Sequence, residues 1–338
     1  MSDDWKRQID ALHSELVRRD DPAAWVSEAD ALDASYLYPH LAVRGPVFGL
    51  AAREPGDETD WRLLNDVMDG TPQQARDGLN SLLWFRAKDD ADGRAERRAL
   101  LAAVARLEQE RVNEVTVLGT RYRVVRGEEF ARAGDDGLEP PRPTDPEPTV
   151  PSWDQRPSPP SHDAGFALAP GRDSGVMAGA LRLALRGFTY AGDDCPPAVR
   201  EEARRAVRDY PEVVLLPVSF GVAERRGERW RPRGALMPTP HDARRLLVHG
   251  LTEFWPLLYD LDDADRAAFA HAADRFKSAG RANEVVVRDQ CFRICRVERM
   301  VRVGPDGPEP ARPSDVETTD PMKLHPTMDE DGAIHYDD

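Results

Sequence analysis

A repeated segment constrains this chain more than any other feature of its sequence. Residues 111–145 read RVNEVTVLGTRYRVVRGEEFARAGDDGLEPPRPTD, and residues 281–315 read RANEVVVRDQCFRICRVERMVRVGPDGPEPARPSD. At a constant offset of 170 positions, without a gap, 17 of the 35 paired residues are identical. Chance would give about two identities over such a length, so the sequence predicts one module written twice in tandem.

Shorter matches carry the repeat upstream with small gaps, so that each copy spans roughly 140 residues and is long enough to bury its own core. The matched pairs are Tyr38-Pro39 with Tyr210-Pro211, Trp61-Arg62 with Trp230-Arg231, and Thr71-Pro72 with Thr239-Pro240. These limits predict a first copy over residues 1–138, a Pro-rich linker over 139–165, a second copy over 166–313 and a tail over 314–338.

Each copy is predicted to be an α+β module, with helices packed on a small, mainly antiparallel sheet. Apolar residues at helical spacing over 5–16 indicate an opening helix. A second helix is expected to end at Tyr38 and, in the other copy, at Tyr210, because the proline that follows disfavours α geometry before it. Thr71 and Thr239 each precede a proline and are expected to cap a further helix.

The repeated segment itself predicts a β-hairpin at the end of each copy. Val115 and Val117 alternate with polar residues, a Leu-Gly-Thr turn follows, and Tyr122 and Val124 alternate again. Residues 285–294 show the corresponding pattern in the second copy.

Two segments outside the copies have compositions that disfavour packed structure. Residues 139–161 carry a proline at nearly every second or third position, which is typical of an extended, semi-rigid spacer. Residues 314–338 carry eight acidic residues against Lys323 alone. We therefore expect the spacer to be extended and the acidic tail to be disordered.

The charge of the chain excludes several classes of partner. A net charge of −15 argues against nucleic acid and against an anionic membrane surface, since both need a surplus of Lys and Arg. No apolar run approaches the roughly 18 residues of a membrane span, and the start MSDDWKRQID lacks the features of a signal peptide. We expect a cytoplasmic protein and leave a protein partner open; the sequence does not indicate an oligomeric state.

No common catalytic or cofactor-binding motif is present. The sequence contains no G-x-G-x-x-G after a strand, no Walker lysine, no H-E-x-x-H, no G-x-S-x-G and no C-x-x-C. Cys291 and Cys295 share one face of a predicted strand and would lie about 13 Å apart, too far for a disulfide. We therefore expect no cofactor and no metal, and two buried, inert thiols.

Four arginines recur at matching places in the two hairpins. They are Arg123, Arg126, Arg293 and Arg296. One hypothesis is structural: each arginine pairs with a carboxylate and fixes a hairpin to a helix. The other is that they form two equivalent ligand-binding sites for anions. The structural hypothesis is favoured, because no glycine-rich or helix N-terminal phosphate cradle is visible nearby.

The run from Tyr38-Pro39 through LNSLLWFRAKDDADGRAERRALLAAVARLEQ to RYRVVR resembles an uncharacterised family from filamentous actinobacteria, known only as a domain of unknown function. The resemblance covers most of the chain. It implies a bacterial, cytosolic setting and supplies no activity, cofactor or site.

Two classes of function stay open at this point. The favoured one is a non-enzymatic interaction or regulatory protein, in which two related halves present one pseudo-symmetric surface or two similar ones. The alternative is an enzyme with its site in the cleft between the copies. Such a site would use residues that differ between the copies, namely His241 against Gln73, His249 against Ser81 and Cys291 against Arg121.

Overall fold

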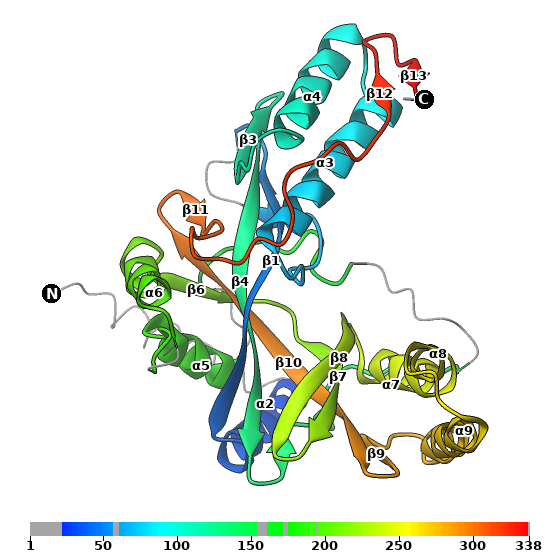
Figure 1. Cartoon of the computed structure of the whole chain (residues 1–338). Coiled ribbons are helices and arrows are strands. Elements are labelled where there is room, and N and C mark those ends of the chain that lie inside the picture. Colours follow the sequence, from blue (N-terminus) through cyan, green and yellow to red (C-terminus); the bar gives the residue numbers. More distant parts are fainter. Residues whose placement is uncertain are drawn as a thin grey trace, which may run out of the picture.

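The structure is a computed structural model that describes residues 22–56, 61–149, 151–153, 161–171, 175–192 and 195–336. The opening helix expected over 5–16 lies outside these residues. The described chain combines helices with antiparallel strands, which confirms the α+β class (Figure 1). We call the described residues up to 138 the first half, and those from 166 to 313 the second half.

One antiparallel sheet runs through the whole molecule. Its main path follows the order β2-β1-β4-β10-β7-β8, and five short strands pair with β4 or β10. The strands of the path are β1 (His40–Arg53), β2 (Arg62–Leu63), β4 (Thr120–Gly134), β7 (Ser219–Arg226), β8 (Arg229–Met237) and β10 (Gln290–Gly304). The short strands are β3 (Glu114–Val117), β5 (Gly137–Leu138), β6 (Glu212–Leu215), β9 (Glu284–Val287) and β11 (Gly307–Pro308). Two hairpins, β3–β4 and β9–β10, therefore occur where the sequence predicted them.

Helices gather at both ends of the sheet and beside its centre (Figure 1). The first end carries α3 (Pro72–Asp89) and α4 (Arg94–Leu107). The other end carries α7 (Pro240–His249), the π-helical turn η1 (Gly250–Phe254), α8 (Trp255–Leu258) and α9 (Asp263–Ser278). Near the centre lie α2 (Pro22–Leu37), α5 (Val176–Arg186) and α6 (Pro197–Asp209). The expected caps are confirmed, since the Thr71 hydroxyl accepts from the Gln74 amide at 3.3 Å and the Thr239 hydroxyl from the Asp242 amide at 3.1 Å.

The strands β4 and β10 join the halves at the centre of the sheet. Glu129 lies opposite Arg299, and these residues occupy matching positions 170 apart. Phe130 pairs with Glu298 on one side, and Glu128 pairs with Met300 on the other. At the offset of 170, Phe130 corresponds to Met300 and Glu298 corresponds to Glu128, so the first of these pairs matches the second. The register is therefore symmetrical about the Glu129–Arg299 pair. The halves thus share a sheet instead of being connected only by the segment 139–165.

The segment that follows each long strand crosses to the opposite half. The Arg126 amide donates to the Glu309 carbonyl at 2.9 Å, and the Arg296 amide donates to the Glu139 carbonyl at 2.9 Å. Residues 139–149 contain no helix or strand and continue along the second half, where Glu147 pairs with Arg244 at 2.5 Å. The described part of the Pro-rich segment is thus extended and also docked.

The acidic tail differs from the expectation of disorder. Residues 314–336 are described and lie along α3 (Figure 1, red). Trp84 Nε1 donates to the Pro326 carbonyl at 3.1 Å, and the His325 ring stacks on Trp84 at 4.7 Å. Met328 is 6% exposed and joins the core beneath α3 and α4. The acidic composition of the tail indicated disorder, but Glu330 pairs with Arg94 and Arg98 of α4. The negative charge of the tail therefore favours its docking.

Truncation after Asp320 is expected to lower the melting temperature by roughly 3–8 °C. The deletion removes Met328 from the core and uncovers the apolar face of Trp84. Thermal unfolding followed by circular dichroism measures the change. The control is Glu330→Gln, which breaks only exposed ion pairs and should shift the melting temperature by about 1 °C or less. An unchanged melting temperature in the truncated chain would mean that the docked tail contributes nothing to stability.

Candidate functional site

The arginines Arg126 and Arg296 lie near the centre of the sheet, each between two carboxylates. Arg126 Nε lies 3.0 Å from Asp315, and its Nη1 lies 2.5 Å from Glu128. Arg296 makes the corresponding pairs with Asp145, at 3.2 Å, and with Glu298. Burial alone would lower the pKa of Arg126, but Glu128 and Asp315 hold it above its usual value. Each guanidinium group therefore pairs with two of the protein's own acids.

The arginines Arg123 and Arg293 lie further along the strands, each under the turn of the opposite half. Arg123 pairs with Glu114 at 2.6 Å and donates to the carbonyls of 306 and 308 at 3.1 and 3.0 Å. Arg293 pairs with Glu284 at 2.7 Å and donates to the carbonyls of 136 and 138 at 2.7 and 3.1 Å. All four predicted arginines thus pair with a carboxylate, as the structural hypothesis required. These carboxylates lie on strands, turns and crossing segments, so the pairs do not fix a hairpin to a helix. The four arginines do not converge on one site, and their binding of anions stays a prediction.

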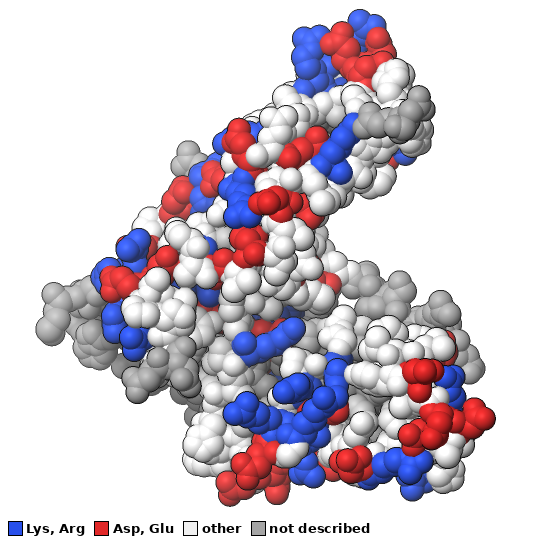
Figure 2. All heavy atoms as spheres, viewed as in Figure 1, with Lys and Arg blue, Asp and Glu red and all other residues white. Residues whose placement is uncertain are grey.

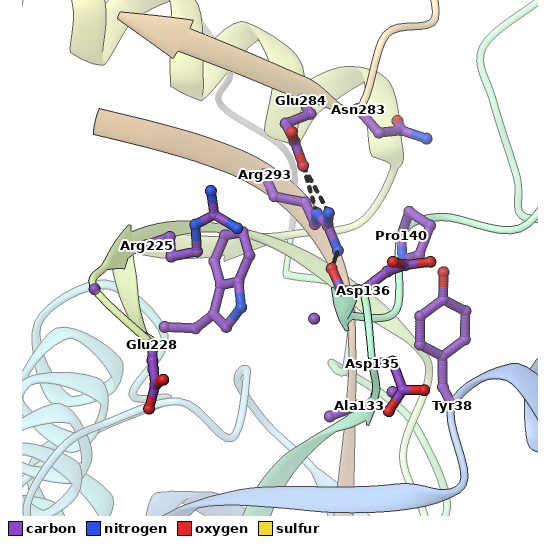
Figure 3. Close-up of a pocket in the computed structure, with 14 residues that line it drawn as sticks. Tyr38, Ala133, Asp135, Asp136, Pro140, Arg225, Glu228, Asn283, Glu284 and Arg293 are labelled. Atoms are coloured by element: carbon purple, nitrogen blue, oxygen red, sulfur yellow. Dashed lines mark hydrogen bonds and ion pairs between the residues drawn. The ribbon is translucent and has the colours of Figure 1, made fainter. Parts of the chain in front are cut away.

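A pocket of about 930 Å³ opens between the halves beside Arg293 (Figure 3). The first half supplies Tyr38 and the turn of residues 133–137 that follows β4. The second half supplies the β7–β8 turn with Glu228 and Trp230, and the hairpin β9–β10. Because both halves contribute walls, the pocket lies where the alternative hypothesis placed its cleft.

Backbone geometry holds the turn of the first half against the indole of the second. Gly137 has a φ of +107°, and a Cβ atom there would come within 2.8 Å of Trp230 Nε1. Only glycine allows both this conformation and this approach. Arg293 lies 4.9 Å from the centroid of the Trp230 ring and binds two carbonyls of the turn. The floor of the pocket is therefore a fixed arginine–indole stack.

The lining of the pocket is rich in carboxylates. The lining contains four carboxylates and two arginines, namely Asp135, Asp136, Glu228 and Glu284 with Arg225 and Arg293. Glu284 already pairs with Arg293. Within the described residues, Asp135, Asp136 and Glu228 form no ion pair with an arginine or a lysine. Burial is the main cause that raises the pKa of Tyr38, which therefore keeps its proton as a donor. Basic side chains gather over β7 and β8 (Figure 2), and on β7 Arg226 is held by Glu224.

The corresponding place in the first half is filled. Arg121 donates to both oxygens of Asp306, at 3.1 and 3.2 Å, and its Nε donates to Glu114 at 2.8 Å. Its guanidinium lies 5.4 Å from the ring of Trp61, which is only 2% exposed. Hydrogen bonds from Arg121 and Arg123 lower the pKa of Asp306 to about 2. Cys291 stands at the matching position in the second half. There the Trp230 ring is met by the guanidinium groups of Arg293, at 4.9 Å, and Arg225, at 5.8 Å, and the third arginine, which Arg121 supplies beside Trp61, has no counterpart among the described residues.

The sequence identified only part of this site. It singled out Arg293 and noted that Cys291 faces Arg121 across the repeat. It gave no reason to connect either residue with Trp230 or with the turn at Asp136, because that turn belongs to the other half. The signal that could have found the pocket is a difference between the matched positions: both halves have a tryptophan, but Cys291 stands where the first half has Arg121.

The remaining candidates from the sequence lie outside the pocket lining. Cys291 and Cys295 are buried free thiols, as expected, and burial raises the pKa of Cys295 to about 12. His241 lies in the first turn of α7, where its ring meets Trp153 edge-on at 5.0 Å. Among the described residues, no group of three or more His, Cys, Asp or Glu side chains is placed to hold a metal ion. None of the described helices is both long and apolar enough to cross a membrane.

A comparison with protein families decides the classification. The profile of a family described as "Family of unknown function (DUF5954)" matches residues 21–318. The chain belongs to DUF5954. No curated protein and no solved structure matches it. Membership in DUF5954 therefore covers both halves and names no activity, so the function of this DUF5954 chain must be inferred from its site.

A titratable group away from the pocket gives this DUF5954 chain a specific dependence on pH. Burial, with Asp77 nearby, raises the pKa of Asp69 to about 6, above the roughly 3.9 of an unfolded aspartate. The protonated form therefore stabilises the fold below about pH 4, and this contribution is lost as the pH rises through 6. Asp69→Asn is expected to raise the melting temperature at pH 8, with no gain at pH 4. Melts of both proteins across this range measure the effect, with the exposed Asp89→Asn as control. A gain independent of pH would contradict it.

Proposed function

We propose that this chain is a cytosolic, non-enzymatic recognition or regulatory protein, formed by tandem duplication of one α+β module, with a single binding pocket between the copies. The observation that carries the proposal is the unequal state of two corresponding places. One is closed by Arg121, and the other is an open pocket with Cys291 at the matching position. Where the side chain that fills this place in one copy is replaced by a smaller one in the other, a cavity is left that can bind a ligand.

The contacts between the halves support an origin by duplication. Arg123 and Arg293 each bind two carbonyls of the opposite turn, and Arg126 and Arg296 each pair with an aspartate of the opposite crossing segment. The proline-rich linker would then be the crossing segment of the first copy, prolonged to reach the second. Such mutual contacts hold the walls of the pocket in fixed positions, which lowers the entropy cost of binding a ligand.

The chemistry of the lining favours binding over catalysis. The pocket offers an indole face, a phenol, carboxylates and two arginines, and its lining contains no histidine, serine, threonine or cysteine. An aromatic platform ringed by charged groups is suited to holding a side chain or a small polar molecule. The net charge of −15 disfavours nucleic acid as the ligand, so a protein or a small molecule is the proposed partner.

Affinity selection tests the proposal. The purified protein is incubated with peptide and small-molecule fractions of a lysate of the source organism, and retained compounds are identified by mass spectrometry. The wild type should retain a compound that Trp230→Ala does not retain. Phe254→Ala, which removes an exposed aromatic side chain away from the pocket, should retain it like the wild type.

The fate of the retained compound separates the two classes of function. Recovery of the compound unchanged after prolonged incubation supports recognition. Recovery with an altered mass, only when Trp230 is present, would overturn the proposal in favour of an enzyme. Equal retention by all three proteins would show that the pocket is not the binding site.

A further inference from the structure

The closed place in the first half indicates which chemical group the open pocket holds. There, the protein binds a guanidinium of its own: Arg121 bridges Asp306 and Glu114 beside the indole of Trp61. Planar guanidinium groups pair with carboxylates through two parallel hydrogen bonds and stack on aromatic faces. The first half therefore contains an occupied guanidinium site.

The second half keeps every residue of that site except the arginine itself. Asp136 corresponds to Asp306, Glu284 to Glu114, and Trp230 to Trp61. All three line the pocket. Figure 3 shows Glu284 and Asp136 on either side of Arg293. We propose that this pocket binds the guanidinium of an arginine side chain from a partner polypeptide, in the place that Arg121 fills in the first half. This inference rests on the proposed function of the pocket.

Two differences between the halves make the open place more negative. Cys291 replaces the cationic Arg121, and Asp135 replaces the neutral Pro305. Each of these differences lowers the formal charge by one unit. A cation bound in the pocket would therefore take the place of the positive charge that Arg121 supplies in the first half. Asp136 has no arginine partner for its side chain in the described structure, whereas Asp306 has two. The carboxylate that a guanidinium would engage is thus available.

Anionic ligands fit the pocket less well, although two arginines line it. Arg293 already donates to Glu284 and to the carbonyls of 136 and 138, which uses four of the five N–H donors of a guanidinium. An anion would also face three carboxylates without an arginine partner. Arg225 is exposed, and its guanidinium lies 5.8 Å from the centroid of the Trp230 ring, as that of the corresponding Arg53 lies 5.3 Å from Trp61 in the first half.

A polypeptide fits the opening better than free arginine does. The pocket is wide, about 930 Å³, and its lining includes the exposed residues Asp135, Asp136 and Glu228. A side chain entering from a peptide leaves its backbone outside and does not need to bury a free carboxylate beside Asp135 and Asp136. Free arginine would bring its α-carboxylate close to these residues, a charge that an arginine within a peptide chain does not carry.

Binding of model compounds tests the inference. The probes are N-acetyl-arginine-N-methylamide, free arginine, the corresponding lysine amide and the corresponding citrulline amide, followed by NMR of the indole N–H groups. The arginine amide should bind saturably and shift the Trp230 signal, which Trp230→Phe assigns. The lysine amide and free arginine should bind at least tenfold more weakly, and neutral citrulline should not bind. Equal binding of lysine or citrulline would overturn the guanidinium assignment, and tighter binding of free arginine would overturn the peptide source.

Substitutions locate the bound group. Cys291→Arg should rebuild the closed arrangement and abolish binding, and Asp136→Asn should weaken it at least tenfold. Asp306→Asn changes the matching residue of the closed place and should leave binding unchanged. If Cys291→Arg does not fold, Asp136→Asn still decides, because Asp136 is exposed. Unchanged binding in Asp136→Asn would overturn the inference. Retention through Trp230 of a compound without a guanidinium would overturn it too, and would leave the proposed function standing.

Discussion

Arg299→Met is expected to lower the free energy of unfolding by about 3–5 kcal/mol, because it leaves Asp163 as an unpaired buried charge. Arg299 and Asp163 form a two-pronged ion pair in which both side chains are 0% exposed. The Arg299 guanidinium also donates to the Ser219 hydroxyl at 2.7 Å and to the carbonyls of 67 and 217 at 3.3 and 3.1 Å. One side chain thus ties the first half, the linker and the second half together.

Urea unfolding of single and double variants measures this effect. Arg299→Met combined with Asp163→Leu should recover a large part of the lost stability, because neither member of the pair is then left as an unpaired buried charge. The control is Arg106→Ala, which breaks an exposed pair with Glu110 and should cost about 0.5 kcal/mol or less. A loss below 1 kcal/mol in Arg299→Met would show that water reaches Asp163 and that the pair is not a buried junction.

Arg126→Ala is expected to have the second largest effect, again about 3–5 kcal/mol. The substitution leaves Glu128 and Asp315 buried without their cation, and the Arg126 side chain is only 2% exposed. Arg296→Ala should cost less, because Arg296 and its partners are more exposed. Arg126→Lys should not restore stability, since one ammonium group cannot reproduce the planar fork that reaches both carboxylates.

Anion titration decides between the two roles considered for these arginines. If the arginines are structural, phosphate or sulfate should not stabilise the parent protein specifically, and each substitution should destabilise it. A strong stabilisation by the anion, lost in Arg126→Ala and Arg296→Ala together with near-normal melting of both variants in its absence, would support the ligand-binding role. Thermal melts with and without the anion provide the measurement.

The local structure of this chain could be predicted from its sequence. The alternation around Tyr122 and Phe292 gave both hairpins, and Thr71 and Thr239 gave two helix starts, because hairpins and caps depend on residues close together in the sequence. The cysteines were expected to be buried for the same kind of reason. Such features need no knowledge of the distant chain.

The arrangement of the halves could not be predicted in the same way. A repeat shows that two segments resemble each other, but the pairing of Glu129 with Arg299 depends on two strands whose other edges are also paired. The docking of the tail depends on Trp84 and on the arginines of α4, which lie more than 200 positions upstream. The pocket depends on a turn of one half lying on an indole of the other. Each is a long-range contact that composition cannot reveal.

The crossing segments also set an order of events during synthesis. The core beneath α3 and α4 includes Met328, and Arg126 finds its partner in Asp315. Both residues emerge about 200 positions after the residues that they contact, which at usual elongation rates is roughly 10–40 s later. During that interval the tail does not yet cover the surface around Trp84, and Asp315 is not yet present to pair with Arg126 beside Glu128. The first half is therefore synthesised first but completes its packing last. A ribosome that stalls within the second half leaves a nascent chain with an exposed apolar face, which chaperones or proteases can bind.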